Sequence, residues 1–251
     1  MSGTSAIIPA RFAATRFPGK LLRDLCGKPV LQWAWEAANE ASEIDEVIIA
    51  AADEKIAEAA ERFGARVAMT DADHSSGTDR IAEVITKTYP SDRPEFVVNI
   101  QGDEPLLTPG ILDAFLRNFI SSGHKLGTII AEANDHEAAD PNTVKVVCRS
   151  DGTALYFSRG AIPGGLGEAV PRRCKHVGIY AFKTHALLEF QRLPSTPLEK
   201  AERLEQLRAL ENGWDIACAE IPEASALIGV DTEEDLRAVE KAMARRNRPS
   251  G

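Results

Sequence analysis

Residues 46–51 read Glu-Val-Ile-Ile-Ala-Ala, and an amphipathic stretch over residues 54–63 follows them directly. The first half of the chain repeats this alternation of a short apolar run with an amphipathic segment. Its strands are predicted over residues 5–8, 46–51, 66–69 and 95–100, and its helices over residues 29–41, 54–63, 77–88 and 109–120. Continuous apolar strands that alternate with helices indicate a parallel sheet covered on both faces.

The second half has a different pattern, in which apolar runs follow one another with little helix between them. Strands are predicted over residues 126–133, 143–149, 153–157 and 176–182, and helices over residues 184–191, 198–211 and 233–246. Successive strands of this kind suggest extra, partly antiparallel pairing. We therefore expect an α/β, Rossmann-like fold with a mostly parallel central sheet, helices on both faces, and an additional small antiparallel sheet or flap.

Length and composition restrict the class of protein. The 251 residues are enough for one large α/β domain. A net charge of −9 argues against nucleic acid or an anionic membrane as a partner, so cations for an anionic substrate must be concentrated locally. The four cysteines form no C-x-x-C pair, which indicates neither a zinc site nor a redox motif. The apolar run over residues 6–8 is too short for a signal peptide or a membrane span, so we expect a cytoplasmic protein.

Polar segments follow each of the four early strands. They are Pro9-Ala10-Arg11, Asp53, the stretch over residues 71–78, and the stretch over residues 101–105. In an open α/β sheet, ligands bind beyond the carboxyl ends of the strands. We therefore expect all four segments to lie along one edge of the sheet.

The loop over residues 9–20 contains three cations, Arg11, Arg16 and Lys20, among small residues. Such a loop can wrap a polyphosphate with both backbone N–H groups and cationic side chains. It is not a Walker P-loop, because the first glycine is missing and Leu21 follows the lysine where Ser or Thr should stand. A solvated basic loop is the alternative interpretation.

Two aspartates are candidate metal ligands. Asp103 follows an apolar strand, where magnesium, which prefers one or two carboxylates together with substrate phosphates, could bind; a tight turn before Pro105 is the alternative. Asp231 precedes the last helix. Thr232 and Asp235 have the spacing of a helix cap, so the cap does not require Asp231. It is either a second metal ligand or an ordinary residue of the helix start.

Other segments suggest contacts to a nucleoside and to a substrate carboxylate. Ser76 or Gly77 is placed to cap the helix that begins there, and the helix start could also contact a nucleoside. Arg159 suits a planar bidentate anion, and residues 175–176 could complete a clamp, although a lone histidine is more often structural. Glu202, Glu205 and Gln206 lie off the apolar stripe of their predicted helix, so they either face solvent or bind sugar hydroxyls.

Together these segments resemble the 3-deoxy-manno-octulosonate cytidylyltransferase family, the CMP-Kdo synthetases. The resemblance covers most of the chain, and its specificity lies in the order of the motifs rather than in any one of them. The matching motifs are Pro9-Ala10-Arg11 with Arg16-x-Pro18-Gly19-Lys20, Ala72-Asp73-His74-x-Ser76-Gly77-Thr78-x-Arg80, Asn99-x-Gln101-Gly102-Asp103-Glu104-Pro105, Pro141-Asn142-x-Val144-Lys145-Val146-Val147, Ala154-Leu155-Tyr156-Phe157-Ser158-Arg159, His176-x-Gly178-Ile179-Tyr180, Leu204-Glu205-Gln206-Leu207-Arg208 and Gly229-Val230-Asp231-Thr232.

The resemblance implies a fold of the nucleotide-diphospho-sugar transferase type and a reaction. The anomeric hydroxyl of the sugar acid would attack the α-phosphate of CTP, giving a CMP-sugar and pyrophosphate for lipopolysaccharide biosynthesis. Mg²⁺ would be the cofactor, CTP and a Kdo-like sugar acid the substrates, and the enzyme would be a homodimer. Residues 1–251 would form a single domain, with residues 1–125 as its nucleotide-binding part and residues 126–251 as its sugar-acid-binding and dimerisation part.

The resemblance also implies roles for individual residues. Lys20, Asp103 and Asp231 would be catalytic, and the two aspartates would hold Mg²⁺. The residues that would bind the nucleotide are Arg11, Arg16, Lys20, Ser76, Gly77, Arg80 and Gln101, of which the first three would contact the triphosphate. The residues that would line the sugar-acid pocket are Arg159, His176, Tyr180, Glu205 and Gln206.

Three departures from the family's pattern concern the sugar more than the reaction. Asp71 stands where related sequences often carry Arg, and Ala50-Ala51-Ala52-Asp53 replaces Val-Ala-Thr-Asp. The segment after Pro163 is short and rich in glycine. Two alternatives therefore stay open: a cytidylyltransferase for another 2-keto sugar acid, such as an amino-Kdo or a nonulosonic acid, and a non-catalytic homologue that binds nucleotide sugars.

Overall fold

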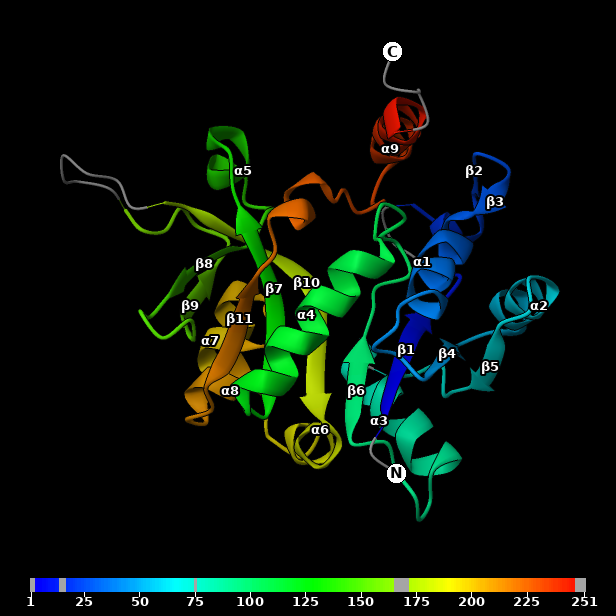
Figure 1. The fold of residues 1–251 in the computed structure, drawn as a ribbon, viewed down its shortest axis with the longest axis horizontal. Coiled ribbons are helices and arrows are strands. Elements are labelled where there is room, and N and C mark those ends of the chain that lie inside the picture. Colours follow the sequence, from blue (N-terminus) through cyan, green and yellow to red (C-terminus); the bar gives the residue numbers. More distant parts are fainter. Residues whose placement is uncertain (1–2, 14–16, 75, 165–171, 247–251) are drawn as a thin grey trace. The chain divides into compact units, whose positions relative to one another are not determined.

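The computed structural model describes residues 3–13, 17–74, 76–164 and 172–246 (Figure 1). The chain divides into two compact units. Unit 1 comprises Met1–Asp113 together with Ala226–Gly251, and unit 2 comprises Ala114–Ser225. The residues predicted to be catalytic or to bind the nucleotide belong to unit 1, and those predicted to bind the sugar acid belong to unit 2.

Unit 1 is built on a parallel sheet with the strand order β6-β1-β4-β5. The strands are β1 (Thr4–Ala10), β4 (Glu46–Ala51), β5 (Arg66–Met69) and β6 (Phe96–Asn99). Ile7 of β1 lies between Ile48 of β4 and Asn99 of β6, and both isoleucines are fully buried. The apolar runs therefore form a parallel sheet with a buried centre, as the sequence predicts.

Two helices of unit 1, α2 and α3, begin after a capping side chain. They are α1 (Val30–Asn39), α2 (Glu54–Arg62), α3 (Gly77–Thr88) and α9 (Glu233–Arg246), and α4 (Pro109–Ser122) crosses the boundary to unit 2. The Asp53 carboxylate accepts from the Ile56 N–H, and the Ser76 hydroxyl accepts from the Asp79 N–H, both at 3.1 Å. Each side chain satisfies an N–H group that a helix start leaves unpaired. The predicted cap at Ser76 is confirmed.

Short elements connect β1 to α1, and the sequence pattern predicts none of them. They are the 3-10 turn η1 (Lys20–Leu22) and the small antiparallel pair β2 (Asp24–Leu25) and β3 (Lys28–Pro29). Elements of two or three residues have too few positions to show a periodicity. Their importance is that η1 begins at Lys20, one of the predicted catalytic residues.

Unit 2 contains a mixed sheet with the order β11-β7-β10-β8-β9. The strands are β7 (Leu126–Glu132), β8 (Lys145–Cys148), β9 (Ala154–Ser158), β10 (Cys174–Lys183) and β11 (Ile216–Glu220). β10 is antiparallel to β7 and β8, and β8 is antiparallel to β9, whereas β11 runs parallel to β7. The predicted antiparallel extension is confirmed, and with the parallel sheet of unit 1 it gives the expected α/β class.

The predicted helix over residues 198–211 is wrong, because the chain forms two helices there. α7 (Pro197–Glu202) ends at Arg203, whose φ of 55° is left-handed, and α8 begins only at Leu207 and continues to Glu211. The sequence also gave no indication of β11, whose alanine and cysteine side chains have weak strand preference. The remaining helical elements are α5 (Asp135–Ala139), α6 (Thr184–Phe190) and the 3-10 turn η2 (Pro222–Ala226).

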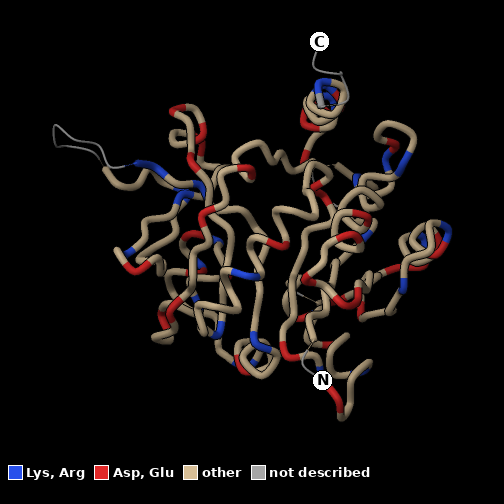
Figure 2. Tube along the Cα trace, viewed as in Figure 1, with Lys and Arg blue, Asp and Glu red and all other residues tan. Residues whose placement is uncertain are grey.

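The surface helices carry charges of both signs. α2 and α9 each carry both acidic and basic residues, as expected for helices with one face in water (Figure 2). Within the described ranges, no helix combines the length and the apolar character that a bilayer span requires. All four cysteines are free thiols.

Candidate active site

Lys20 joins two carboxylates that are far apart in the sequence. Its Nζ atom lies 2.5 Å from Asp103 Oδ2 and 2.7 Å from Asp231 Oδ1. The exposed fractions of the side chains are 16% for Lys20, 24% for Asp103 and 46% for Asp231, so the cluster is partly buried and still accessible to a ligand. The structure thus brings together the three residues that the family resemblance marks as catalytic.

The position of Lys20 depends on the glycine before it. Gly19 has a φ of 69°, a left-handed conformation that favours glycine. Its N–H donates to Phe12 O at 3.0 Å, and a Cβ atom at this position would lie 3.0 Å from the Phe12 ring. The loop closes on itself in this way and directs the lysine toward Asp103.

The loop after β6 places Asp103 by close packing and by a backbone hydrogen bond. A Cβ atom on Gly102 would come within 2.8 Å of Leu31 Cδ1, so a larger residue would displace either the loop or the Leu31 side chain. The Val230 N–H donates to Asp103 O at 2.8 Å. This bond fixes the segment that carries Asp231 beside the end of β6.

The cap at the start of α9 does not use the Asp231 side chain, which contacts Lys20 instead. The Asp235 carboxylate accepts from the N–H groups of Asp231 at 3.1 Å and of Thr232 at 2.8 Å, and the Asp235 N–H donates to Thr232 Oγ1 at 3.2 Å. The predicted cap between Thr232 and Asp235 is confirmed. It uses only the backbone of Asp231, whose carboxylate contacts Lys20.

The charges in this cluster favour a further cation. Burial by itself would lower the pKa of Lys20, but the neighbouring Asp103 and Asp231 carboxylates outweigh it and raise the pKa above its usual 10.5. Lys20 is therefore an ammonium at neutral pH. The two carboxylates still outnumber it, so the cluster keeps a net negative charge.

A cavity of about 310 Å³ opens beside the cluster. The predicted phosphate ligand Arg11 contributes to its wall, so cations and carboxylates face one space. Such a combination suits a polyphosphate bound together with a divalent cation. The lining residues are Pro9, Arg11, Ala13, Phe17, Lys20, Leu21, Gln101, Gly102, Asp103 and Asp231.

A second cavity of about 200 Å³ adjoins the first through three shared lining residues. It is lined by Pro9, Ala10, Arg11, His74, Ser76, Gly77, Arg80 and Gln101. A Cβ atom on Gly77 would lie 3.3 Å from Pro9, so the start of α3 packs closely against the end of β1. Every described residue that was predicted to bind the nucleotide lines one of the two cavities; Arg16 lies outside the described residues.

Arg80 supplies a buried positive charge to the second cavity. It is 3% exposed, and its guanidinium donates to Asp71 O at 2.8 Å and to Thr70 Oγ1. Burial lowers the pKa of Arg80, and the nearby positive charge of Arg11 acts in the same direction. An arginine nevertheless stays charged in a protein, so two guanidinium groups face this space.

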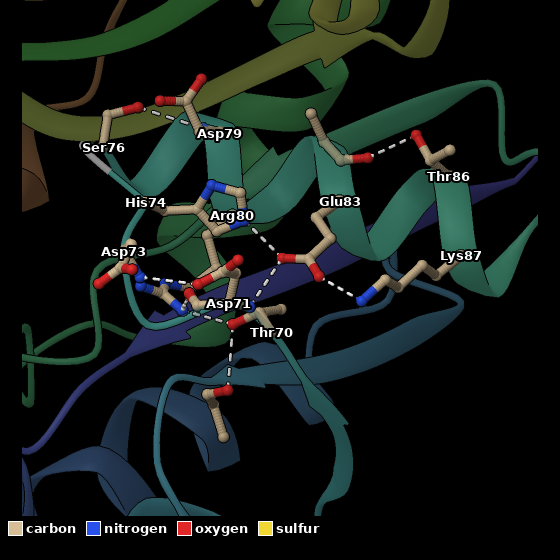
Figure 3. A network of polar contacts seen from close by, with 12 residues as sticks. Thr70, Asp71, Asp73, His74, Ser76, Asp79, Arg80, Glu83, Thr86 and Lys87 are labelled. Atoms are coloured by element: carbon tan, nitrogen blue, oxygen red, sulfur yellow. Dashed lines mark hydrogen bonds and ion pairs between the residues drawn. The ribbon is translucent and has the colours of Figure 1, made fainter.

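Figure 3 shows Glu83 of α3 at the centre of a polar network. His74 Nε2 and Lys87 Nζ contact its carboxylate, and the Asp71 N–H donates to Oε2 at 3.0 Å. Burial would raise the pKa of Glu83, but these donors outweigh it and lower the pKa to about 2. An ionised carboxylate only accepts hydrogen bonds, so Nε2 of His74 carries a hydrogen and the ring orientation is fixed. Sequence reasoning gave His74 no role; its place in the motif over residues 72–80 was the available signal.

The Asp71 side chain serves a local turn. Its Oδ1 atom accepts from the Asp73 N–H at 2.9 Å, which is a turn closed by an aspartate side chain. Its main chain contacts Glu83 and Arg80 on either side. The aspartate at this departure from the family's pattern therefore organises the loop that leads into α3.

His176 and Tyr180 of β10 lie together in unit 2. Their ring centroids are 5.3 Å apart, and the Phe157 ring meets His176 edge-on at 5.2 Å. The Thr128 hydroxyl donates to Ile179 O at 2.8 Å and lies 3.0 Å from His176 Nε2. The same hydroxyl lies 3.2 Å from Val177 O, so it joins the His176 ring to the backbone of β10.

The structure corrects the expectation that residues 175–176 form a cationic clamp. Burial lowers the pKa of His176 to about 3, so the ring is neutral at physiological pH. Lys175 is 6% exposed, and its Nζ atom donates to Glu137 Oε1 at 2.5 Å and to Ser225 O at 2.8 Å. Burial also raises the pKa of Tyr180, whose phenol therefore keeps its proton. The histidine and the tyrosine offer hydrogen bonds rather than charge.

Glu205 and Gln206 lie in the turn between α7 and α8. Gln206 is 5% exposed, and among the described residues its Nε2 atom has no hydrogen-bond partner. Glu205 Oε1 lies 3.7 Å from Arg208 Nη2, and the Glu205 charge acts on Tyr180. The burial of Gln206 excludes the solvent-facing alternative for this residue.

Arg159 follows β9 and is held by Glu202 of α7. Its Nε donates to Glu202 O at 3.0 Å, and its backbone N–H donates to Glu202 Oε2 at 2.8 Å. Nη1 donates to Pro141 O at 3.3 Å. The sequence pattern predicts only that Glu202 faces solvent or binds sugar hydroxyls. It does not predict the contact with Arg159, because that contact depends on the end of α7 at Arg203, which the helical pattern does not show.

The described part of the chain contains no group of three or more His, Cys, Asp or Glu side chains that could hold a metal ion. Asp103 and Asp231 form a pair of carboxylates instead. Such a pair matches magnesium, which takes one or two carboxylates and completes its shell with phosphate and water oxygens.

Comparison with known proteins gives consistent matches over nearly the whole chain. A family model described as cytidylyltransferase matches residues 5–216. A 3-deoxy-manno-octulosonate cytidylyltransferase from Solibacter usitatus is 47% identical over 238 residues, covering 94% of this chain and 92% of the relative. One from Geobacter metallireducens is 43% identical over 254 residues, covering 96% and 98%.

Solved structures agree with the sequence matches. The structure of CMP:2-keto-3-deoxy-manno-octonic acid synthetase complexed with CTP has a TM-score of 0.91 and 38% identity, covering 98% of this chain and 100% of that one. A 4-diphosphocytidyl-2C-methyl-D-erythritol synthase from Anaerococcus prevotii shares the fold, with a TM-score of 0.63 at 14% identity and coverage of 97% and 99%. The chain therefore belongs to the cytidylyltransferase family of nucleotidyltransferases, and within it to the 3-deoxy-manno-octulosonate cytidylyltransferases, the CMP-Kdo synthetases.

Proposed function

We propose that the protein transfers CMP from CTP to the anomeric hydroxyl of 3-deoxy-manno-octulosonate (Kdo) and releases pyrophosphate. The observation that carries this proposal is the contact of Lys20 with Asp103 and Asp231 beside a cavity that Arg11 also lines. Nucleotidyl transfer needs alignment and neutralisation of phosphate charge more than a covalent nucleophile. The names and the CTP complex of the relatives support the same reaction.

In this proposal the nucleotide binds in unit 1. Arg11 and Lys20 contact the triphosphate, since both cations line the first cavity. The nucleoside extends into the second cavity. Gly77, the first residue of α3, lines this cavity and brings the N–H groups of the helix start to it, and Arg80 adds a positive charge. Gln101 lines both cavities, which suits a contact with the part of the nucleotide between them.

Asp103 and Asp231 are the residues that would hold Mg²⁺. Their carboxylates converge on one ammonium, that of Lys20, and both keep an exposed fraction of at least 24%. When bound, Mg²⁺ lowers the pKa of a coordinated hydroxyl and screens the charge of the phosphates. The chemistry of this donor set fits the ion, because hard carboxylate oxygens are its preferred protein ligands.

The chemical step is a displacement at the α-phosphorus. The anomeric oxygen of Kdo forms a bond to this phosphorus while the bond to the bridging oxygen of the pyrophosphate breaks. The hydroxyl proton passes to solvent water, and the electron pair of the broken bond leaves with pyrophosphate. Arg11 and Lys20 neutralise the negative charge that grows on the leaving group.

The sugar acid binds in unit 2 in this proposal. Arg159 pairs with its carboxylate, since a guanidinium suits a planar bidentate anion. His176, which is neutral, and Tyr180 hydrogen-bond to its hydroxyl groups. The buried amide of Gln206 and the carboxylate of Glu205 complete the polar lining.

Pyrophosphate release from CTP in the presence of Mg²⁺ and Kdo tests the reaction. We expect turnover to require both substrates and to stop when EDTA removes the cation. A panel with amino-Kdo, a nonulosonic acid and the nucleotides ATP, GTP and UTP tests the substrates. Turnover of another sugar acid but not of Kdo would correct the sugar, and CTP binding without turnover of any acid would indicate a non-catalytic homologue.

The Arg159→Ala variant tests the assignment of the two substrates to the two units. Loss of a charge-assisted pair with the sugar carboxylate should raise the KM for Kdo by about ten-fold or more, with little change in the KM for CTP. A defect confined to CTP binding would contradict the assignment. Circular dichroism of the variant controls for the fold.

We further propose a cytoplasmic homodimer that supplies CMP-Kdo for lipopolysaccharide synthesis, with unit 2 as the interface. Two large apolar side chains of unit 2 support this: Leu155 on β9 is 50% exposed and Leu198 on α7 is 39% exposed. Light scattering after size-exclusion chromatography should give a dimer mass, and Leu155→Glu should shift it to the monomer mass. A monomeric wild-type protein would overturn this part of the proposal.

A further inference from the structure

Arg159 is held by two charged residues that lie outside the proposed set of substrate contacts, Glu202 and Lys145. We propose that these two are positioning residues, which fix the Arg159 guanidinium for the carboxylate of the sugar acid. This inference rests on the proposed function and deepens the role of Arg159 there. Neither residue touches the substrate in this proposal; both act through the arginine.

Glu202 holds the backbone and the side chain of Arg159 at once. Its Oε2 atom accepts from the Arg159 N–H at 2.8 Å, and its carbonyl oxygen accepts from Arg159 Nε at 3.0 Å. Its Oε1 atom accepts from Ser158 Oγ at 2.7 Å, with a longer contact of 3.5 Å from the Tyr156 hydroxyl. Both carboxylate oxygens of Glu202 therefore accept hydrogen bonds from the residues at and just after the end of β9. The left-handed Arg203 ends α7 at this residue and leaves the Glu202 carbonyl oxygen to the arginine.

Lys145 holds the main-chain carbonyl group of the same arginine. It is fully buried, and its Nζ atom donates to Asp140 O at 2.7 Å, Thr143 O at 2.6 Å and Arg159 O at 2.7 Å. Burial lowers the pKa of Lys145, but a neutral amine has only two N–H groups and could not serve three carbonyl oxygens. These contacts therefore require the ammonium. All three acceptors are carbonyl oxygens, and the carboxylates of Asp140 and Glu202 stabilise the charge without a hydrogen bond to it.

The contacts also indicate which edge of the guanidinium meets the substrate. The Nε–H is used by Glu202 O, and Nη1 donates once to Pro141 O at 3.3 Å. We therefore place the sugar carboxylate at the edge formed by Nη1 and Nη2, where two parallel hydrogen bonds can form. Holding the arginine in advance reduces the side-chain entropy that is lost when the acid binds.

A matched pair of variants, Glu202→Ala and Glu199→Ala, separates positioning from stability. Glu199 lies on the same helix and forms a partly buried ion pair with Arg208, with side chains 12% and 13% exposed and an oxygen–nitrogen distance of 2.5 Å. Both variants remove a paired carboxylate from α7, and both should lower the melting temperature. Only Glu202→Ala should raise the KM for Kdo, by about ten-fold, with the KM for CTP unchanged.

Two further variants strengthen the comparison. Glu202→Gln keeps one acceptor oxygen for the Arg159 N–H, so its KM for Kdo should lie between those of wild type and Glu202→Ala. Lys145→Met removes the bond to Arg159 O and should raise the same KM. If Lys145→Met does not fold, its role is judged from Lys145→Arg, which keeps the charge but not the three-carbonyl geometry and should also raise the KM for Kdo.

The outcomes distinguish this inference from the proposed function. If wild type converts Kdo and Glu202→Ala resembles Glu199→Ala in both KM values, the positioning role is overturned while the function stands. If wild type converts another 2-keto sugar acid, the same comparison with that acid decides the question. If wild type converts no sugar acid, the proposed function is overturned and this inference with it.

Discussion

The Lys20 ammonium lies 2.7 Å from Asp231 Oδ1, although 211 residues separate the two in the chain. The contact exists because the Val230 N–H donates to Asp103 O and thereby holds the start of α9 against the loop that follows β6. One ammonium then faces two carboxylates in a partly buried setting, where removal of any member leaves charge uncompensated.

Asp103→Asn should lower kcat by about two or more orders of magnitude, because it removes one of the two carboxylates proposed to hold Mg²⁺. The fold should survive, since the change is isosteric and the Val230 bond is made to the backbone. Pyrophosphate release and the melting temperature measure the two effects. Asp215→Asn is the control, because Asp215 is 50% exposed and pairs with Arg149 in unit 2. Wild-type turnover in Asp103→Asn would rule out its proposed role.

Lys20→Met should make the protein bind divalent cations more tightly. Without the ammonium, Asp103 and Asp231 repel each other, and a cation relieves that repulsion. The rise in melting temperature on addition of Mg²⁺ should therefore be larger in Lys20→Met than in wild type or in the variant of an exposed lysine, Lys200→Met. Equal shifts in all three proteins would show that Lys20 does not compete with the ion. This measurement does not depend on turnover.

Stability at acid pH should depend on Glu83. Its pKa of about 2 lies below the ordinary 4.5, so the unfolded chain binds the proton more readily than the folded one. The network therefore contributes stability that is complete above about pH 4.5 and is lost as the pH falls toward about 2. Urea midpoints between pH 2 and 6 should fall more steeply for wild type than for Glu83→Gln. Parallel curves would contradict the lowered pKa.

His176 should stay neutral throughout the working range of pH. Burial lowers its pKa from 6.5 to about 3, so its contribution to stability is full above about pH 6.5 and is lost as the pH falls toward 3. The ring signals of His176 in NMR titrations should show no protonation step between pH 5 and 8. The exposed His185 serves as an internal reference. A midpoint near the ordinary value for His176 would contradict its lowered pKa.

Patterns of apolar residues predicted the elements of unit 1 closely, because strand and helix periodicities there are local properties of the chain. The prediction was wrong where a single backbone conformation decided the outcome. Leu204 and Leu207 continue a helical stripe across Arg203, yet the left-handed φ of 55° at Arg203 ends α7. A hydrophobic pattern does not reveal that an arginine adopts this conformation. The end of α7 at this point places Glu202 in contact with Arg159.

By itself, the sequence determined the α/β class, the caps at Ser76 and Thr232, and the position of Asp103 at the end of a strand, because each depends on neighbours in the chain. Its motifs also indicated the family. Only the tertiary structure decided that Asp231 meets Lys20, that His176 is neutral, and that Glu202 and Lys145 hold Arg159. These depend on burial and on contacts between distant segments, which follow from how the chain packs and not from the order of its residues along any one segment.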